Sequence, residues 1–378
     1  MRSFLRSGLL LAAIGLTVFT SCRRDGDENG QTSETKIDHL LIQEVYYGGT
    51  YFTRTYSGKV YNETYDDDKY IKIYNPTSKT IYLDNYALAV HLFDPCDRID
   101  LKDEYNFIKT HFGVSTLVLF GGNGTQHPLA AGASVVIAKK AINHRVDKEK
   151  YLKENGEDLK NYQRLDQLLD LSKADYQWIP KDEVKGVGSN VREMTLWYSQ
   201  GDWKKEEMSN FDVSNKTAIA LIKLGDTPEN IKQTFLKELG YTKAEDIAKR
   251  KYCKNIAYQS NGHHSQEATL LIMPYDWVID VVTICPNTEF KWSLVAAEVD
   301  KGHKGVQETT NDKIEKHAGK ALIRRFDGNK FVDNNNSTSD FEVVEASLFS
   351  KKSKELVYCP TKQQAISFSG LSLCTNTR

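Results

Sequence analysis

The chain has 378 residues, with 50 Lys and Arg against 51 Asp and Glu, and a formal net charge of −1 at pH 7. This balance argues against the basic footprint of a general nucleic-acid-binding protein and against a strongly acidic, solvating chain. Beyond the N-terminal region no run is apolar enough for a membrane-spanning helix, and no linker rich in Pro, Gly or Ser divides the body, so we expect one folded domain.

The N-terminus has the pattern of a lipoprotein signal. Arg2 and Arg6 precede an apolar run at residues 9–19, which is too short to span a bilayer comfortably, and small residues lead to Cys22. We therefore predict a signal peptide over residues 1–21 and a lipid anchor on Cys22 that attaches the mature protein to a membrane. The alternative is an ordinary signal peptide that is cut nearby and leaves a free cysteine.

Residues 22–36 are polar and begin with a cluster of charges. Such a composition cannot bury a core, so it predicts a flexible tether. An acidic patch directly after the lipidated cysteine resembles the surface-export signal of outer-membrane lipoproteins in some Gram-negative anaerobes, and a plain soluble linker explains it equally well. Either interpretation puts the body outside the inner membrane, and we expect an outer-membrane protein that faces the periplasm or the cell surface.

The clearest local structure lies in residues 66–88, which read as strand, turn and strand. Apolar residues alternate with polar or aromatic ones at 70–74, and Asn-Pro-Thr-Ser at 75–78 supplies the turn. Before this stretch, residues 40–49 predict a first strand that ends at two glycines. Residues 50–64, rich in Tyr and Thr, predict an exposed ribbon or loop.

Two helical insertions interrupt the later strands. Leucines and tyrosines at helical spacing predict the first near residues 145–172, and the second spans 228–252, with Thr227 as N-cap and Pro228 at the first helical position. The remaining predicted strands are apolar runs bounded by turn or polar residues, at 117–120, 135–138, 215–225, 269–273, 277–284 and 321–326.

The order of these signals resembles a lamin-tail-type domain, an immunoglobulin-like β-sandwich. Four stretches carry the resemblance: the Asn-Pro turn and Asp-x-Tyr-x-Leu strand within 70–88, the Leu-x-x-Gly turn and buried strand at 129–138, the Asp-Val strand at 280–282, and the closing Arg to Asn-rich run at 324–341. The resemblance implies a mainly β fold, a lamin-tail-like immunoglobulin-type β-sandwich with helical insertions over residues 37–350. Residues 351–378 would form a C-terminal extension.

The layout of signal, tether and interrupted sandwich is also similar to a family of uncharacterised lipoproteins from Gram-negative gut and oral anaerobes. No activity comes with that resemblance. The recognisable motifs of nucleophilic catalysis and phosphate binding are missing, because the chain has no Gly-x-Ser-x-Gly elbow and no P-loop.

Candidate metal ligands are few. The six cysteines form no Cys-x-x-Cys pair, and the adjacent His263 and His264 belong to no His-Glu-x-x-His pattern, so we do not expect zinc. Asp66, Asp67 and Asp68 are candidate calcium ligands because calcium prefers several oxygens, but no EF-hand spacing supports them. We favour a solvated charge run beside an edge strand there, and we expect no cofactor.

Two further features have a structural interpretation. Residues 333–340 offer many oxygens, which the family resemblance assigns to Asx turns in preference to calcium. Cys359 and Cys374 are candidates for a disulfide that closes a short loop in an oxidising compartment, although the odd number of cysteines after Cys22 leaves at least one thiol unpaired.

The aromatic content is the remaining lead to function, with 20 Tyr and 5 Trp. Exposed tyrosines stack on sugar faces or anchor protein partners, although Tyr is also a favourable strand residue. The candidate binding residues lie in and beside the predicted ribbon and are Tyr46, Tyr47, Tyr51, Tyr56, Tyr61 and Tyr65.

These observations predict a cell-envelope lipoprotein that acts as a non-enzymatic binding or structural module, with a protein or glycan partner and no nucleic acid. One alternative is a surface hydrolase or metal-dependent enzyme, because paired carboxylates meet only in space and a sequence does not reveal them. Another alternative is a subunit of a surface filament, which predicts donated strands and polymerisation.

Overall fold

The structure, a computed structural model, describes residues 37–346 with gaps at 102–104, 200–210, 212 and 263–264. The predicted signal peptide, Cys22, the tether, the pair Cys359 and Cys374, and the C-terminal extension lie outside the described residues, as do His263 and His264. Within the described part, no helix has the length and apolar character needed to cross a membrane.

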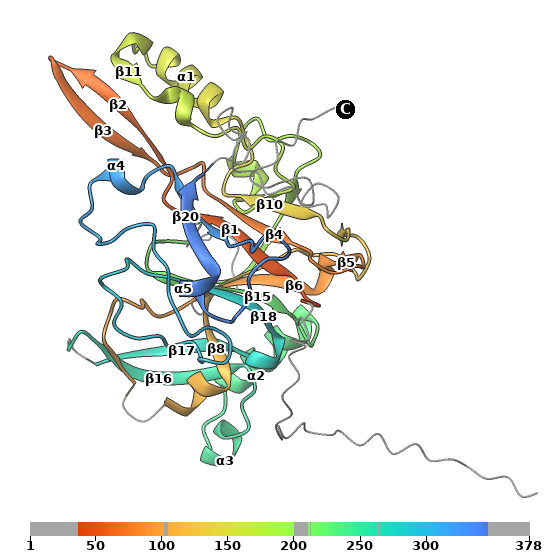
Figure 1. Ribbon diagram of the computed structural model, residues 1–378. Helices are drawn as coiled ribbons and strands as arrows, with labels where there is room; N and C mark the ends of the chain where they lie inside the picture. Colours follow the sequence, from red (N-terminus) through yellow and green to blue (C-terminus); the bar gives the residue numbers. More distant parts are fainter. Residues whose placement is uncertain (1–36, 102–104, 200–210, 212, 263–264, 347–378) are drawn as a thin grey trace, which may run out of the picture. The chain divides into compact units, whose positions relative to one another are not determined.

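Two large sheets dominate the described chain (Figure 1). In the first, β1 and β4 are antiparallel neighbours, with Ile42 opposite Ile73, so the first predicted strand pairs with the strand before the Asn-Pro turn. The first sheet has seven strands in the spatial order β13 (Arg192–Glu193), β12 (Tyr176–Gln177), β10 (Ser134–Ala138), β4 (Tyr70–Tyr74), β1 (Leu41–Tyr46), β19 (Lys320–Arg324) and β20 (Phe341–Glu345).

The second sheet has eight strands and every pairing in it is antiparallel. Strand β14 also pairs with β8, outside the linear order of the other seven strands. The strands are β18 (Val278–Ile284), β15 (Thr217–Lys223), β6 (Tyr86–His91), β8 (His111–Leu119), β17 (Gln266–Pro274), β16 (Cys253–Ser260), β7 (Ile99–Asp100) and β14 (Thr195–Ser199).

The main core lies between the inner faces of these sheets. Ile71 and Ile73 of β4 belong to one cluster of buried apolar side chains with Leu88 and Val90 of β6 and Ile219 of β15. In β4 and in β6 these residues are two positions apart, because alternate side chains point to the same face of a sheet. The prediction of a mainly β, sandwich-like fold is therefore confirmed.

The outer face of the eight-stranded sheet is covered in part by helix α2 (Pro228–Leu239). Ile231 and Phe235 of this helix pack against Ala220 and other small and apolar side chains of the sheet. The helix begins as the sequence predicts, with Pro228 in its first turn and the Thr227 side chain accepting a hydrogen bond from Asn230 N at 3.2 Å. A short helix, α3 (Ala244–Ile247), follows it.

The first predicted insertion is helical only at its start, in α1 (His144–Glu154). Gly156, with φ +75°, follows the end of the helix, and residues beyond it form two 3₁₀ turns and the short strand β11 (Tyr162–Gln163). Leu159, Leu165 and Leu168, which suggested one long helical face, instead converge from separate turns onto a shared apolar cluster, whereas Leu169 belongs to another cluster. The other short elements are β5 (Ile81–Tyr82), β9 (Pro128–Leu129), α4 (Ile314–His317) and α5 (Ser337–Asp340).

The Asn-Pro turn is tied to the Leu-x-x-Gly turn by the side chain of Asn75. Its amide nitrogen donates to the carbonyl oxygens of Lys79 at 2.8 Å, Leu129 at 2.9 Å and Ala130 at 3.2 Å. The backbone adds a bond from Gly132 N to Asn75 O at 2.8 Å. Two turns that are separate in sequence therefore form one hydrogen-bonded unit.

Asp84, in the predicted strand after that turn, organises a second loop. Its carboxylate accepts backbone hydrogen bonds from Gly124 at 3.0 Å, Gln126 at 2.8 Å and His127 at 2.9 Å. Burial opposes the charge, but these three donors hold the pKa of Asp84 below its usual value. The loop approaches so closely that a Cβ at Gly122 would lie 2.1 Å from the Asp84 carboxylate.

Candidate binding surface

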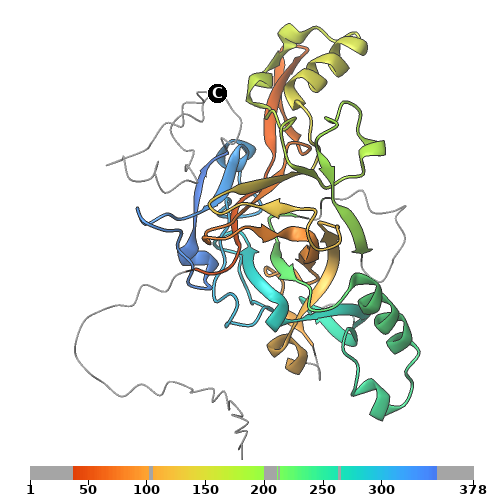
Figure 2. The same ribbon diagram turned by 90° about the vertical axis from the view of Figure 1, so that its right-hand side faces the viewer.

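A β-hairpin made of β2 (Thr50–Tyr56) and β3 (Lys59–Tyr65) forms the candidate surface, and residues 50–65 are called the arm below. Together with β11 it forms a separate sheet in the order β11-β2-β3, and it lies beside α1 in both views (Figures 1 and 2). Ser57 and Gly58 join the strands with φ +50° and +74°, which are the two positive values that a tight type I′ hairpin turn requires.

The root of the arm is held by Tyr65 and His144. Burial lowers the pKa of His144 to about 4, so the imidazole is neutral at physiological pH. Its Nε2 lies 3.0 Å from the Lys140 carbonyl oxygen and can only donate to it. The other nitrogen, Nδ1, therefore accepts the Tyr65 hydroxyl hydrogen bond at 3.0 Å. This arrangement fixes the end of β3 against the start of α1.

One side of the arm packs on an apolar cluster of its own. Phe52 is 2% exposed and shares this cluster with Leu152 of α1, Tyr162 of β11 and two further leucines. Arg54 adds an ion pair to Glu157 at 2.7 Å. The arm is therefore a supported element with a defined position beside α1.

The distal part of the arm is exposed and partly apolar. Tyr56 is 63% exposed, Val60 is 66% exposed and Tyr61 is 47% exposed. On neighbouring α1, Val146 and Tyr151 are also exposed. Strand β3 is the last strand of its sheet, so in the described structure its outer edge has no paired strand. This edge combines exposed apolar side chains with backbone groups that no described strand pairs, and the Asn62 side chain donates a hydrogen bond to Glu315 of α4.

Only some of the six predicted tyrosines contribute to this surface. Tyr46 and Tyr47 are buried, because β1 lies inside the seven-stranded sheet; Tyr46 packs on the ring of Tyr70 at 5.3 Å, and the Tyr47 hydroxyl accepts a hydrogen bond from Val306 N at 2.7 Å. Tyr51 is also buried, with a guanidinium group 4.1 Å from its ring centroid. The prediction that these three residues bind a ligand at the surface was wrong.

Tyr65 is half-buried on His144, whereas Tyr56 and Tyr61 are exposed where the sequence placed them. Sequence reasoning missed Val60, the most exposed large apolar residue of the arm. The signal for it was present, because Ser57-Gly58 is a hairpin turn followed by residues of high strand propensity.

The three candidate calcium ligands have protein partners of their own. Asp67 forms ion pairs with Lys139 at 2.9 Å and Lys140 at 2.7 Å, and Asp66 lies 3.4 Å from Lys69. Two ammonium groups against Asp67 oppose the approach of a cation. Among all residues that the structure describes, no three His, Cys, Asp or Glu side chains come together in a way that could hold a metal ion.

The sequence suggested that Asp68 is part of a solvated charge run, and the structure contradicts this. It is fully buried and accepts hydrogen bonds from the Thr50 hydroxyl and, at 3.2 Å, from Thr50 N. Burial raises the pKa of Asp68 to about 7 although these donors oppose the rise. Asp68 therefore belongs to the root of the arm, where Gly49, with φ +65°, lies directly against the backbone of Tyr65 at the end of β3.

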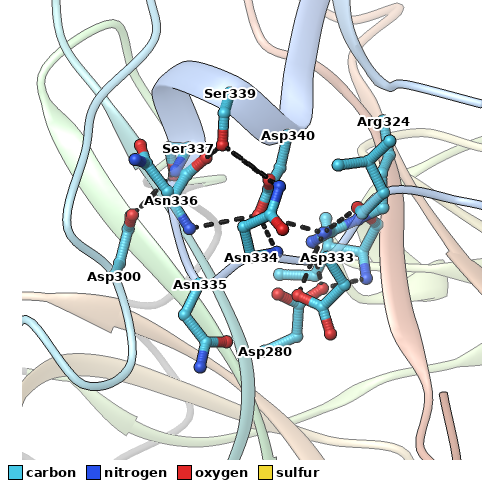
Figure 3. A network of polar contacts seen from close by, with 12 residues as sticks. Asp280, Asp300, Arg324, Asp333, Asn334, Asn335, Asn336, Ser337, Ser339 and Asp340 are labelled. Atoms are coloured by element: carbon cyan, nitrogen blue, oxygen red, sulfur yellow. Dashed lines mark hydrogen bonds and ion pairs between the residues drawn. The ribbon is translucent and has the colours of Figure 1, made fainter. Parts of the chain in front are cut away.

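The Asn-rich closing run surrounds a buried arginine (Figure 3). Arg324 is 1% exposed, and its guanidinium lies 2.5 Å from Asp280, 3.5 Å from Asp333 and 3.7 Å from Asp340. Burial raises the pKa of Asp280 to about 6, an effect that the arginine opposes. The position that a cation would occupy among these carboxylates is already filled by the guanidinium.

The same run also closes on the sheet through Asp300. Its carboxylate accepts hydrogen bonds from the Ser337 hydroxyl at 2.6 Å and from Ser337 N at 2.8 Å (Figure 3). It also accepts a hydrogen bond from Thr283 N at 3.0 Å. Asp340 in turn accepts from the backbone of Asn334 at 2.9 Å. These contacts give residues 333–340 the structural role that Asx turns predict.

A small cavity lies at the end of β6. It is lined by His91, Asp94, Thr283 and Trp292 among others, and it has about 10 Å³ of space for a water-sized sphere. The His91 Nε2 is buried without a hydrogen-bond partner in the described structure. This volume is about that of a single water molecule, and it is too small for an organic substrate.

Comparison with known proteins identifies the family. Residues 130–347 match the family described as "Protein of unknown function (DUF4876)". The fold is similar to the crystal structure of a DUF4876 family protein from Bacteroides thetaiotaomicron VPI-5482, with a TM-score of 0.54 and 21% identity over 81% of this chain and 71% of that chain. No curated protein matches the sequence. The family match covers more than half of the residues of this chain, and the chain therefore belongs to the DUF4876 family.

Proposed function

We propose that this protein is a non-enzymatic binding module of the cell envelope and that its arm binds a protein partner. The body serves as the scaffold, which we propose to be a lamin-tail-like sandwich. The proposed address is the outer membrane, with a lipid on Cys22 and the tether of residues 22–36 between the lipid and the body. The lipoprotein pattern of the N-terminus supports this address.

The observation that carries the proposal is the open edge of β3. An exposed strand edge with apolar side chains is an aggregation hazard, and proteins usually cover such an edge or blunt it with charge. Here Val60 and Tyr61 stand between only two charged positions of the strand, Lys59 and Glu63. An extended segment of another protein would satisfy the free backbone groups and cover these side chains.

The chemistry of the arm favours a protein over a glycan. Sugars stack on open aromatic faces, but the guanidinium of Arg54 lies 5.6 Å from the ring centroid of Tyr56 and covers one face of that ring. Val60, the most exposed apolar residue of the arm, offers no ring at all. A mixture of aliphatic, aromatic and backbone groups is typical of strand addition between proteins.

Site-specific photocrosslinking in cells tests the proposal with the full chain. A photoreactive phenylalanine analogue replaces Val60 in one strain and Leu236, which is 41% exposed on α2, in the control strain. We expect a protein adduct from position 60 that is absent from position 236. The pair Val60→Thr and Tyr61→Thr keeps strand propensity, and it should weaken capture of that partner at least tenfold without unfolding the protein.

Four results would contradict the proposal. Equal crosslinking at positions 60 and 236 would remove the arm as the binding surface. An adduct that contains only a second copy of this chain would favour the filament subunit. Hydrolysis of a glycan or phosphoester by the purified protein, lost on substitution of a single carboxylate, would favour the enzyme. Binding to a glycan array that survives the double Thr substitution would place recognition elsewhere.

A further inference from the structure

Two cysteines that are distant in sequence meet at one end of the eight-stranded sheet. Cys96 lies in the loop that leaves β6, and Cys285 directly follows β18. Both are free thiols, buried at 8% and 0% exposure, and their side chains are in hydrogen-bond contact. Neither belongs to the pair that the sequence suggested.

The topology of the sheet explains why they meet. Strand β15 lies between β6 and β18 and is antiparallel to both. Ile219 pairs with Val90 of β6, and Thr217 pairs with Ile284 of β18, so the C-terminal ends of β6 and β18 leave the sheet at the same end. The residues that follow these two strands are therefore neighbours.

Further contacts hold the two segments together independently of the thiols. The carbonyl oxygen of Pro95 accepts hydrogen bonds from Lys291 N at 2.9 Å and Trp292 N at 3.3 Å. The Asp94 carboxylate lies 3.9 Å from the ammonium group of Lys216, the residue before β15. The loop at residues 94–96 is thus held against the segment that follows Cys285.

The environment of the thiols makes them poor nucleophiles in the folded state. The hydrogen bond with Cys285 and burial both raise the pKa of Cys96, so its thiolate fraction at neutral pH is small. The pair is therefore poorly suited to catalysis or to metal capture. Two adjacent thiols of low reactivity, contributed by distant parts of the sequence, are placed as the cysteines of a structural disulfide would be.

We propose that Cys96 and Cys285 form a disulfide when the chain folds in contact with a disulfide oxidant, such as oxidised glutathione or a thiol–disulfide oxidoreductase. One cysteine thiolate attacks the oxidant's disulfide and forms a mixed disulfide, and the other then displaces the remaining oxidant thiol. The two cysteines lose two protons and two electrons, which reduce the oxidant to two thiols. In the cell this bond rests on the proposed envelope address, because cytosolic thiols are kept reduced.

The bond would close a long loop, residues 96–285, which contains both helical insertions and most of the eight-stranded sheet. Disulfides that close long loops restrict the unfolded chain most. The crosslink would therefore stabilise the body and fix the wall of the cavity beside His91.

The test is peptide mapping of the full chain after it is reduced, denatured and refolded in a glutathione redox buffer. Free thiols are then blocked by alkylation. We expect one peptide pair that links Cys96 to Cys285, lighter by two hydrogen atoms than its reduced parts. We also expect the thermal midpoint to lie roughly 5–10 °C above that of the reduced protein.

Matched variants assign the effect. Cys285→Ala should abolish both the linked peptide and the difference in thermal midpoint between oxidised and reduced protein. Cys253→Ala, at another buried thiol, should retain both. Alkylation of Cys96 and Cys285 in refolded wild-type protein would overturn the proposal, whatever other cysteines pair.

The same peptide mapping, applied to cells whose thiols have been trapped with acid, distinguishes failure of the disulfide proposal from failure of the proposed envelope location. If the bond forms in the purified protein while both thiols are reduced in cells, the pairing is supported and the envelope address is contradicted. If the bond is present in cells, both are supported.

Discussion

The guanidinium of Arg324 and the carboxylate of Asp280 lie 2.5 Å apart, and the side chains are 1% and 5% exposed. They join the last strand pair of one sheet to the edge strand of the other, because β19 and β18 lie in different sheets. The guanidinium Nε also donates to the Ile42 carbonyl oxygen at 2.9 Å. A single buried arginine therefore ties three strands together.

Replacing Arg324 by Met should reduce the free energy of unfolding by about 3–5 kcal/mol, because the loss of one partner leaves a buried carboxylate unpaired. Chemical denaturation monitored by tryptophan fluorescence measures this value. Arg325→Met is the matched control, since the Arg325 side chain is exposed and the change should stay within about 0.5 kcal/mol. Equal effects of the two substitutions would show that the buried network contributes nothing specific.

Asp68 predicts a pH dependence of stability. Its folded-state pKa of about 7 lies above the value of an unfolded aspartate, so its contribution is fully present below about pH 4 and is lost as the pH rises through 7. Asp68→Asn mimics the protonated form and should remove at most about 4 kcal/mol of decline between pH 4 and 7. Denaturation curves across this range give the difference between wild type and variant.

The control for this experiment is Asp66→Asn, which changes an exposed neighbour. It should leave the wild-type pH slope in place. A wild-type slope that persists in Asp68→Asn would show that the buried carboxylate does not titrate in this range.

The protein should lose stability both when the Asn75 amide is removed and when it is replaced by a carboxylate. Asn75→Ala loses the bonds to three carbonyl oxygens and should cost about 3 kcal/mol of unfolding free energy. Asn75→Asp keeps the oxygen that accepts from Thr77 but turns a carboxylate oxygen toward those carbonyls, so it should cost at least as much. Thermal unfolding compares the two, and an Asp variant as stable as wild type would contradict the donor role of the amide.

Gly122 should tolerate no side chain. Its φ is +86° and an added Cβ would press on the Asp84 carboxylate, which accepts three backbone hydrogen bonds. Gly58→Ala is the control, because its φ of +74° carries a similar backbone penalty of about 1–2 kcal/mol with no atom within 4 Å. Gly122→Ala should lower the unfolding free energy clearly more than Gly58→Ala does in denaturation experiments. Equal losses would show that the loop moves away from the added Cβ without further destabilisation.

Phe52→Ala should loosen the arm without unfolding the sandwich. The Phe52 side chain packs in the apolar cluster between the arm and α1. Truncation of a buried phenylalanine to alanine costs about 3–5 kcal/mol of unfolding free energy in a protein core. Hydrogen exchange should show faster exchange at amides of residues 50–65 and unchanged exchange in β15. The exposed Val60→Thr change should leave both regions unaffected, and equal acceleration in β15 would mean that arm and body unfold together.

Local sequence determined much of the framework. The alternation around Ile71 and Ile73 gave a strand with the correct inner face, and Thr227 and Pro228 gave the start of α2, because strand alternation and helix capping depend on near neighbours. The turn at Asn75 was also visible, since the Asn75 side chain accepts a hydrogen bond from Thr77 N two positions later. For the arm, strand propensity located Tyr56 and Tyr61.

Tertiary structure decided which of these residues are accessible and which distant residues meet. Tyr46 and Tyr47 resemble the arm tyrosines in sequence but lie within and directly after an inner strand, and Asp68 is buried while neighbouring Asp66 stays in solvent. The meeting of Cys96 and Cys285 depends on the order of three strands in a sheet. Burial and long-range contact follow from strand order, which is set by the total free energy of packing two sheets, and a local window of sequence does not contain that information.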